Sequence, residues 1–344
     1  MDIAEFDYEL PAEAIAQEPL PERDASRLLV LNRRSGHLRH RSFRDLPELL
    51  DPGDLLVVNR SRVFPARLLG RRAGGAEAEV LLLRPLGQGL WEALVRPGRR
   101  LRPGHEVLVG GEIALRIESE ALGAEGRRRV RLLARAGDET AALERLGHIP
   151  LPPYIRRPDR PEDRGRYQTV FARESGSVAA PTAGLHFTPQ LLRRLDARGI
   201  QRAEVLLHVG PGTFRPVKAA RVEDHRLEAE PYLIPPETAT AVAATRNQGR
   251  RVVAVGTTST RALEASAARH GKVSAETAAT DLVIVPGFGF RVTDGLITNF
   301  HLPRSSLLLL VCALAGREVV LGAYREAVKA GYRFYSYGDA MLIL

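Results

Sequence analysis

The stretch Arg251-Val252-Val253-Ala254-Val255-Gly256-Thr257-Thr258-Ser259-Thr260-Arg261 decides the fold class, because an apolar run gives way directly to a glycine and a series of hydroxyl side chains. The run 251–255 is typical of a buried strand, and we expect a helix from Arg261 to Arg269 after the loop. The same order of strand and helix recurs along the chain from Tyr167 onward. Such alternation predicts an α/β core.

Apolar runs and helix-boundary residues mark the other elements of this core. Thr188, Pro189 and Gly199 supply an N-cap, a first-turn proline and a stop for one expected helix. The expected strands lie at 28–31, 55–58, 203–207 and 282–285, and the expected helices at 189–198, 236–248, 306–315 and 318–330.

Residues 63–147 have a different pattern, in which short strand-like runs are separated by glycine and proline. The runs lie at 79–83, 91–95, 106–109, 113–117 and 129–133. This pattern favours a small antiparallel barrel or sandwich. We therefore expect an inserted β domain at 63–148 and a discontinuous α/β core made of 1–62 and 149–344. Residues 148–166, rich in proline, arginine and aspartate, are expected to form a surface linker.

The chain is basic, with 50 lysine and arginine residues against 41 aspartate and glutamate residues in 344, a net charge of +9. Nearly all of the cations are arginines, whose planar guanidinium groups suit phosphate. This balance fits a polyanionic partner such as a nucleic acid, and it equally fits a solvated basic surface. Composition alone leaves both open.

Other features of the composition disfavour several classes of protein. The single cysteine, Cys312, cannot form an internal disulfide and fits a reducing cytosol. The first residues lack the apolar segment of a secretory signal, and the longest apolar run, 307–315, is about half a membrane span. We therefore expect a soluble, cytoplasmic protein. The histidines show no close metal-ligand spacing, and the acidic cluster at 223–230 is interpreted as a solvated turn, so no metal is expected.

The segment 175–188 is dense in small residues immediately before an expected helix. Small residues let a ligand approach the backbone, and a helix N-terminus offers free N–H groups and partial positive charge. His186 has a side chain suited to acid–base chemistry near neutral pH. The alternative is a tight turn that contains a structural histidine.

Four further segments have residues suited to ligands. The segment 208–214 follows an expected strand and carries two glycines, which permit unusual backbone angles. Residues 256–264 offer hydroxyl and N–H groups for a carboxylate or a ribose, or else for helix capping beside an exposed ion pair. The segments 295–303 and 332–341 combine aromatic and polar side chains that suit base stacking and core packing equally.

The strongest sequence signal is a series of motifs in a fixed order. They are Phe6-Asp7-Tyr8-Glu9-Leu10-Pro11, Ile15-Ala16-Gln17, Ser26-Arg27-Leu28-Leu29, Pro65-Ala66-Arg67-Leu68, Tyr167-Gln168-Thr169-Val170, the run 179–188, Ala254-Val255-Gly256-Thr257-Thr258, the run 298–303 and Tyr337-Gly338-Asp339-Ala340-Met341. Over nearly the whole chain this series resembles the S-adenosylmethionine:tRNA ribosyltransferase-isomerase family of queuosine biosynthesis.

The resemblance implies a barrel-like α/β core with an inserted antiparallel all-β barrel. It also implies a monomeric transferase that uses S-adenosylmethionine as co-substrate and has no bound cofactor. The enzyme would transfer and isomerise the ribosyl part of S-adenosylmethionine onto 7-aminomethyl-7-deazaguanine at the wobble position of tRNA. Epoxyqueuosine-tRNA would form, with adenine and methionine released.

In the light of this resemblance we assign candidate roles to individual residues. His186 is the first candidate for a general base, and His301, Asp281 and Asp339 are candidates for protonating adenine or deprotonating the amine. The residues expected to contact S-adenosylmethionine are Ser177, Ala180, Pro181, Thr182, Gly184, Gly210, Gly212, Thr213, Gly256, Thr257, Thr258, Ser259, Arg261 and Asn299. The residues expected to bind tRNA phosphates, together with the β insertion, are Arg156, Arg157, Arg160, Arg164 and Arg166.

Three positions depart from the family pattern, and their roles stay open. Arg60 stands where the family usually has aspartate, Leu207 where it has threonine, and Glu228 where it has histidine. Two rival functions also remain. An RNA methyltransferase is disfavoured because no early strand precedes a Gly-x-Gly-x-Gly loop. A non-catalytic RNA-binding module would explain the charge but not the ligand-like loops of the core.

Overall fold

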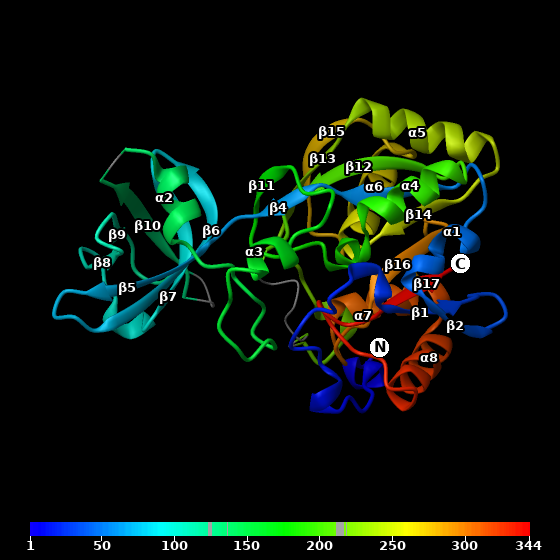
Figure 1. Ribbon diagram of the computed structural model, residues 1–344, viewed down its shortest axis with the longest axis horizontal. Coiled ribbons are helices and arrows are strands. Elements are labelled where there is room, and N and C mark those ends of the chain that lie inside the picture. Colours follow the sequence, from blue (N-terminus) through cyan, green and yellow to red (C-terminus); the bar gives the residue numbers. More distant parts are fainter. Residues whose placement is uncertain (123–125, 136, 211–216, 218) are drawn as a thin grey trace.

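The computed structural model describes residues 1–122, 126–135, 137–210, 217 and 219–344. A larger α/β body holds both chain termini, and a smaller β-barrel body lies at the other end of the long axis (Figure 1). The α/β class with an antiparallel β-barrel is thereby confirmed.

The larger body is built on one mixed sheet. Its strands are β1 Arg27–Leu31, β2 Leu38–Ser42, β3 Leu55–Asn59, β12 Gln201–Leu207, β13 Glu230–Ile234, β14 Val252–Val255, β15 Glu276–Thr280, β16 Gly295–Asn299 and β17 Ala340–Ile343. Among the described residues the order is β15-β13-β12-β3-β14-β16-β17-β1-β2. Strands β12, β3, β14 and β16 are parallel, and the sheet reverses direction between β16 and β17.

Helices cover both faces of this sheet. They are α1 Leu46–Leu49, α4 Pro189–Ala197, α5 Pro236–Asn247, α6 Thr257–His270, α7 Ser306–Ala315 and α8 Arg317–Lys329. Alternate residues of β1 face opposite helices: Leu28 and Val30 pack with α1 and α4, whereas Leu29 and Leu31 pack with α7 and α8. Apolar runs without polar alternation are typical of strands covered on both faces.

No helix in the described ranges is by itself long and apolar enough to cross a membrane. Helices α7 and α8 meet the requirements of length and composition only as a pair, with a bend of 115° between them.

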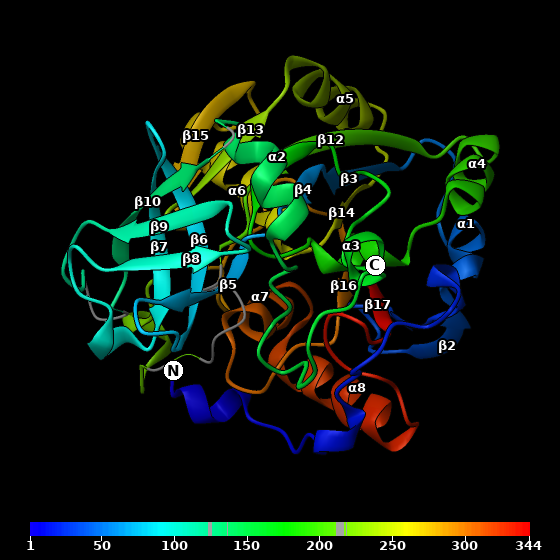
Figure 2. The same cartoon turned by 60° about the vertical axis from the view of Figure 1, so that its left-hand side comes forward.

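The smaller body is a closed antiparallel barrel. Its strands are β5 Arg67–Arg72, β6 Glu77–Gly87, β7 Leu90–Arg96, β8 Glu106–Val109, β9 Ile113–Ile117 and β10 Arg128–Ala134, in the closed order β10-β7-β6-β5-β8-β9. Five of these strands were expected from the sequence, and β5 was not. Helix α2, Glu139–Leu146, was also not expected, and it packs Ala142 and Leu143 against the apolar interior of the barrel (Figure 2).

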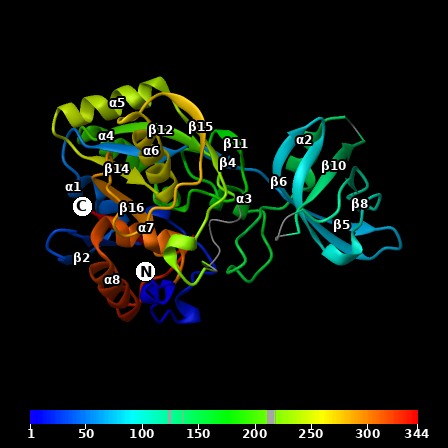
Figure 3. The same cartoon turned by 180° about the vertical axis from the view of Figure 1, so that it is seen from behind.

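The two bodies are connected by the chain and also by side-chain contacts, namely apolar packing and an ion pair. The chain enters the barrel after β4, Ser61–Val63, which pairs in parallel with β11, Glu174–Ser177. Val178, next to β11, packs into the apolar cluster of the barrel. Arg127 of the barrel forms an ion pair with Glu228 of the larger body. Figure 3 shows this junction from behind.

Three local expectations are wrong. Residues 282–285 form no strand, because β15 ends at Thr280 and the chain continues irregularly. Helix α6 begins at Thr257 and not at Arg261, because Gly256, with φ of 89°, makes the turn from β14 directly into the helix. Residues 148–166 are not simply a surface linker, since they include helix α3, Asp163–Arg166, whose first residue is buried.

Candidate active site

His186 lies at the end of a short 3₁₀ helix, Thr182–His186, that precedes α4. Its side chain is buried and stacks on Phe43, with 4.9 Å between the ring centroids. Nδ1 lies 2.7 Å from Ser26 Oγ, and Nε2 lies 3.1 Å from Nδ2 of Asn299, the last residue of β16. Both ring nitrogens therefore have partners.

The Asn299 amide determines which nitrogen of His186 carries the proton. Asn299 Nδ2 also donates to the carbonyl oxygen of Tyr335, at 3.2 Å, and only the NH₂ group can donate. The amide nitrogen therefore faces His186, whose Nε2 must accept. The proton then lies on Nδ1, which donates to Ser26 Oγ, while the Ser26 hydroxyl donates to the Arg23 carbonyl at 3.3 Å.

The surroundings of His186 keep its imidazole neutral. Burial, and next the positive charges of Arg23 and Arg333, lower the pKa of His186 to about 3. Proton uptake by His186 would require Asn299 to turn away from Nε2 and a negative charge to come close.

Asn299 and Tyr335 both line a small pocket, and each has a buried polar atom there without a partner among the described residues. These atoms are Asn299 Oδ1 and the hydroxyl oxygen of Tyr335. Tyr335 also has a left-handed backbone, with φ of 73°, which costs a bulky residue on the order of 1 kcal/mol. Buried polar groups are rarely left unpaired, so these two atoms favour a polar ligand here.

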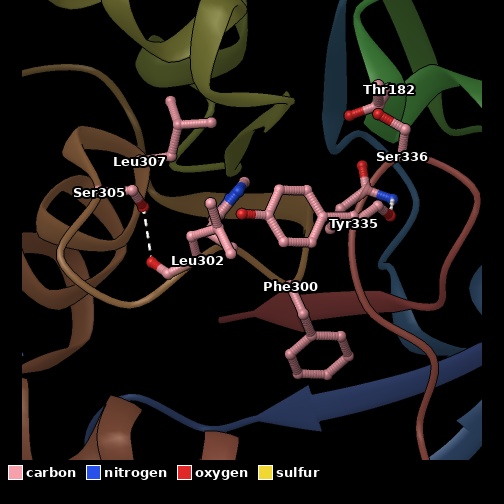
Figure 4. Close-up of a pocket in the computed structure, with 9 residues that line it drawn as sticks. Thr182, Phe300, Leu302, Ser305, Leu307, Tyr335 and Ser336 are labelled. Carbon is pink, nitrogen blue, oxygen red and sulfur yellow. Dashed lines mark hydrogen bonds between the residues drawn. The ribbon is translucent and has the colours of Figure 1, made fainter. Parts of the chain in front are cut away.

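Figure 4 shows the ring of Tyr335 in this pocket, with Leu302 and Leu307 toward its hydroxyl end and Thr182 and Ser336 toward its backbone. The free volume of about 10 Å³ matches a single water molecule. A ligand the size of a nucleoside therefore enters only if these side chains move.

His301 lines the same pocket and is likewise buried. Its Nε2 lies 2.7 Å from Thr298 Oγ1, and its main chain bonds to the hydroxyl groups of Tyr8 and Tyr324. Burial lowers the pKa of His301 to about 3. The structure therefore places His301, Asn299 and Thr182 around one pocket, and Asn299 connects this pocket to His186.

The N-terminus of α6 adjoins this region. Gly256 is its N-cap residue and supplies no side-chain cap, and a Cβ on Gly256 would lie 3.7 Å from Ala183. The start of α6 thus packs next to Ala183 of the 3₁₀ helix that carries His186. Ser259 Oγ donates to the Val255 carbonyl at 2.9 Å, so its hydroxyl is used within the chain.

Three predicted residues have other surroundings. Asp339 accepts the backbone N–H groups of Arg27 and Arg333, both at 2.8 Å, which fixes the start of β17, and burial raises its pKa. Asp281 is exposed and lies outside the pocket of Asn299. Arg261 is buried and pairs with Glu230.

The small residues of the 177–184 segment are explained partly by packing. A Cβ on Gly184 would lie 2.9 Å from Thr169, and Ala180 belongs to an apolar cluster with Leu185. Pro181 precedes the 3₁₀ helix and is buried. Ser177 Oγ accepts the N–H of Val209 at 2.9 Å.

The predicted glycine loop after β12 is only partly described. Gly210 donates its N–H to Glu230 Oε1 at 3.1 Å. Gly212 and Thr213 lie outside the described residues. At the start of α6, Thr257 is buried, and the Thr258 hydroxyl lies 3.4 Å from Asn59 Nδ2.

The five predicted tRNA-binding arginines divide into two groups. Arg157 forms an ion pair with buried Asp163, at 2.7 Å. Arg164 and Arg166 donate to backbone carbonyl groups. Arg156 is exposed, and Arg160 is exposed with Glu18 at 3.1 Å. The last two are the most accessible to an external phosphate.

The positions that depart from the family pattern have structural partners. Arg60 lies 2.7 Å from Glu174, Leu207 is buried and bonds through its backbone to Asn59, and Glu228 pairs with Arg127 of the barrel. Glu230, expected in a solvated acidic turn, is instead buried.

No group of three or more histidine, cysteine, aspartate or glutamate side chains that could hold a metal ion is found in the described parts of the chain.

Sequence reasoning missed Ser26 and Tyr335 as parts of this site. Ser26 was noted only as the start of a motif, and Tyr335 only as one aromatic residue among several. The signal for Ser26 is chemical, since a hydroxyl orients a buried histidine. It cannot be recognised before the fold brings residues 26 and 186 together.

Comparisons with known proteins give the family. The model of the queuosine biosynthesis protein family matches residues 3–343. The chain is 56% identical over 346 residues to the S-adenosylmethionine:tRNA ribosyltransferase-isomerase of Moorella thermoacetica and 55% identical over 348 residues to that of Heliobacterium modesticaldum, with 100% of each chain covered.

A solved structure agrees with these matches. The crystal structure of S-adenosylmethionine tRNA ribosyltransferase from Thermotoga maritima matches with a TM-score of 0.56 and 42% identity, over 99% of this chain and 100% of that one. Fold, motifs and matches thus define a transferase of tRNA modification that acts in queuosine biosynthesis. More particularly, the chain belongs to the S-adenosylmethionine:tRNA ribosyltransferase-isomerase family.

Proposed function

We propose that this enzyme transfers the ribosyl part of S-adenosylmethionine to 7-aminomethyl-7-deazaguanine at the wobble position of tRNA and isomerises it. Epoxyqueuosine-tRNA, adenine and methionine are the products. Family membership supports the reaction, and the pocket lined by Asn299 and Tyr335, with two unpartnered buried polar atoms, supports its location.

The proposed chemistry begins at the sulfonium, which acidifies the adjacent 5′ carbon. A base removes a proton there, and elimination opens the ribose ring, leaving a vinyl sulfonium and adenine. The aminomethyl nitrogen adds to the 4′ carbon and regenerates an ylide, which closes a five-carbon ring on the 1′ aldehyde. The resulting alkoxide expels methionine as the epoxide forms. Each proton transfer is general acid–base work.

His186 is the first candidate for the base that removes the 5′ proton, and Asn299 is the residue that orients its imidazole. His186 Nε2 becomes available only when Asn299 gives up its hydrogen bond, so substrate must displace that contact. His301, which lines the pocket of Asn299, is the candidate acid for adenine. Asp339, already bonded to two backbone N–H groups, supports the site by holding β17, and Asp281 is the weakest of the four candidates.

We further propose that the uncapped first turn of α6, from Gly256 to Ser259, contacts the carboxylate or ribose of S-adenosylmethionine. A helix N-terminus favours negative charge. Arg261, which follows this turn in α6 and is held by Glu230, is not part of that contact.

We also propose that residues 63–148 form a separate domain inserted into a catalytic core of 1–62 and 149–344. The barrel, together with exposed Arg156 and Arg160, would bind tRNA phosphates, and the enzyme would work as a monomer. Sedimentation of the enzyme, alone and with tRNA, measures its oligomeric state, and the mass of a single chain is expected for the enzyme alone.

Product identity tests the proposed function. The enzyme is incubated with S-adenosylmethionine and tRNA carrying 7-aminomethyl-7-deazaguanine, and the small products are separated by chromatography. Adenine and methionine in equal amounts are expected. S-adenosylhomocysteine would show a methyltransferase, and tight tRNA binding without turnover would show a binding module.

A further inference from the structure

A second hollow adjoins the pocket of Asn299, because Ser336 lines both. Its lining includes Ser26 and His186 and two guanidinium groups, those of Arg23 and Arg166. None of its lining residues carries a carboxylate. We call it the Arg23–Arg166 hollow.

Each of the two arginines donates hydrogen bonds to backbone carbonyl groups in the segment next to the other: Arg23 to Gly165, and Arg166 to Leu20 and Pro21. The bond from Arg23 to Gly165 measures 2.6 Å, and Arg23 also donates to the carbonyl oxygen of Leu185, at 3.1 Å. All of these acceptors are uncharged, so the hydrogen bonds orient the guanidinium groups without neutralising them.

Aspartates next to these segments are already engaged. Asp24 accepts the hydroxyl of Thr188 at 3.0 Å. Asp163 accepts two N–H groups of Arg157, at 2.7 and 2.9 Å. Asp339 accepts backbone N–H groups. Hydrogen bonds to neutral donors leave the charges of Asp24 and Asp339 in place, but among the described residues neither Arg23 nor Arg166 forms an ion pair with a carboxylate.

The pKa of Arg23 reflects the burial and the mutual repulsion of these guanidinium groups. Burial, and next repulsion from Arg166, lower the pKa of Arg23 to about 10. A third guanidinium, that of Arg333, adds to the positive charge near His186, and its Nη1 is buried with no partner among the described residues. Like charges held together in a partly buried place are stabilised by an anion.

We propose that the Arg23–Arg166 hollow binds a phosphodiester group of the tRNA next to the nucleotide that is modified. A phosphodiester carries only negative charge and matches the fork of a guanidinium. The carboxylate of S-adenosylmethionine fits less well, because an ammonium group on the neighbouring carbon and the sulfonium would face the same arginines. The free volume of about 20 Å³ accommodates an oxygen of the phosphate rather than a whole substrate.

This inference rests on the proposed function, since it requires a tRNA substrate. It adds the contact that would place the modified nucleotide beside His186. It also separates Arg166 from the other linker arginines, whose guanidinium groups lie outside the lining of the hollow.

The test is a cycle of protein and RNA changes. The RNA is an anticodon stem-loop carrying 7-aminomethyl-7-deazaguanine, with either natural linkages or one neutral methylphosphonate on the 5′ or the 3′ side of that nucleotide. The proteins are the wild type, Arg166→Gln and Arg166→Lys. Arg194→Gln is the matched control, because Arg194 also donates to a backbone carbonyl, that of Arg44 at 2.8 Å, but lies on α4 outside the hollow.

With the wild type, one of the two methylphosphonates should weaken RNA binding by roughly 10-fold, the loss of a charge-assisted hydrogen bond. Arg166→Gln should weaken binding of the natural RNA by a similar factor and show no further loss with that methylphosphonate. Arg166→Lys should lie between the two, and Arg194→Gln should behave as the wild type. The KM for S-adenosylmethionine should stay within about twofold.

Independent losses from Arg166→Gln and the methylphosphonate would overturn the inference, as would the absence of either loss in a protein with wild-type thermal unfolding. A raised KM for S-adenosylmethionine with unchanged RNA affinity would assign the hollow to the amino-acid carboxylate instead. Adenine release by the wild type is measured in the same samples. Its absence would overturn the proposed function, whereas its presence with an unaffected Arg166→Gln would overturn only the role of the hollow.

Discussion

Asn299 Nδ2 donates both to the carbonyl oxygen of Tyr335 and to Nε2 of His186, at 3.2 and 3.1 Å. The first bond orients the amide, and the second therefore sets the neutral, Nδ1-protonated form of His186. Because Asn299 lines the pocket and His186 lines the Arg23–Arg166 hollow, this one contact connects the two. A ligand that accepts the hydrogen bond of the Asn299 amide would free Nε2 of His186 to accept a proton.

Replacing Asn299 with aspartate should favour a proton on Nε2 of His186 and raise its pKa. A carboxylate 3 Å from Nε2 favours the imidazolium, and we expect the pKa of His186 to rise by about 1–3 units. Nitrogen chemical shifts of His186, measured as a function of pH by NMR, give this value directly. An unchanged neutral Nδ1–H form in Asn299→Asp would show that the amide does not control the imidazole.

Stability should fall as the pH is lowered from neutrality. Burial lowers the folded-state pKa of both His186 and His301 to about 3, whereas an unfolded histidine titrates near 6.5. The unfolded chain therefore binds more protons below pH 6.5, and each histidine should reduce the free energy of unfolding by about 1.4 kcal/mol per pH unit between 6.5 and 3. Urea unfolding of the wild type and of His301→Asn at pH 7 and pH 5 measures this. Equal pH slopes for the two proteins would contradict it.

Tyr335→Phe should separate ligand binding from stability. Among the described residues the Tyr335 hydroxyl has no hydrogen-bond partner. Its removal should therefore leave the free energy of unfolding unchanged or slightly raised, while the KM for S-adenosylmethionine rises. Tyr337→Phe is the matched control, because the Tyr337 hydroxyl donates to Asp163 at 2.8 Å and its loss should destabilise the fold by about 1–3 kcal/mol. A destabilised Tyr335→Phe with normal KM would remove the hydroxyl from the ligand site.

Arg261→Gln should act on stability and not on substrate affinity. Arg261 is buried and bonds to Glu230 and to the carbonyl oxygens of Leu282 and Thr280, which tie α6 to β13 and β15. Breaking a buried pair leaves a charge uncompensated and costs about 3–5 kcal/mol. Thermal unfolding should show the loss, and Arg261→Gln/Glu230→Gln should recover part of it. A large rise in the KM for S-adenosylmethionine in a stably folded Arg261→Gln would restore the carboxylate role expected from the sequence.

The sequence predicted the elements of this fold well where the local pattern and the burial agreed. The helix at 189–197 has the cap, proline and stop that its sequence indicates, and the strands 28–31 and 55–58 are apolar on both faces because helices cover both. The segment 282–285 has the same apolar pattern but forms no strand, because apolar residues also pack in irregular loops.

Side-chain roles were less predictable, because they depend on partners distant in the sequence. Arg261 and Asp339 have residue types suited to a ligand site, and the structure shows that Glu230 and two backbone N–H groups already occupy them. Ser26 and Arg23 could not be predicted as site residues for the same reason, because only the fold brings them next to His186. Gly212 and Thr213 lie outside the described residues and stay predictions.

The central claim is that the buried His186, held by Asn299, belongs to the catalytic site of ribosyl transfer. The most direct measurement is the rate of adenine release in a single turnover by His186→Ala, with tRNA carrying 7-aminomethyl-7-deazaguanine and saturating S-adenosylmethionine. A rate roughly 100-fold or more below that of the wild type is expected if His186 transfers a proton. A rate near that of the wild type, in a variant that retains the native fold, would contradict the claim.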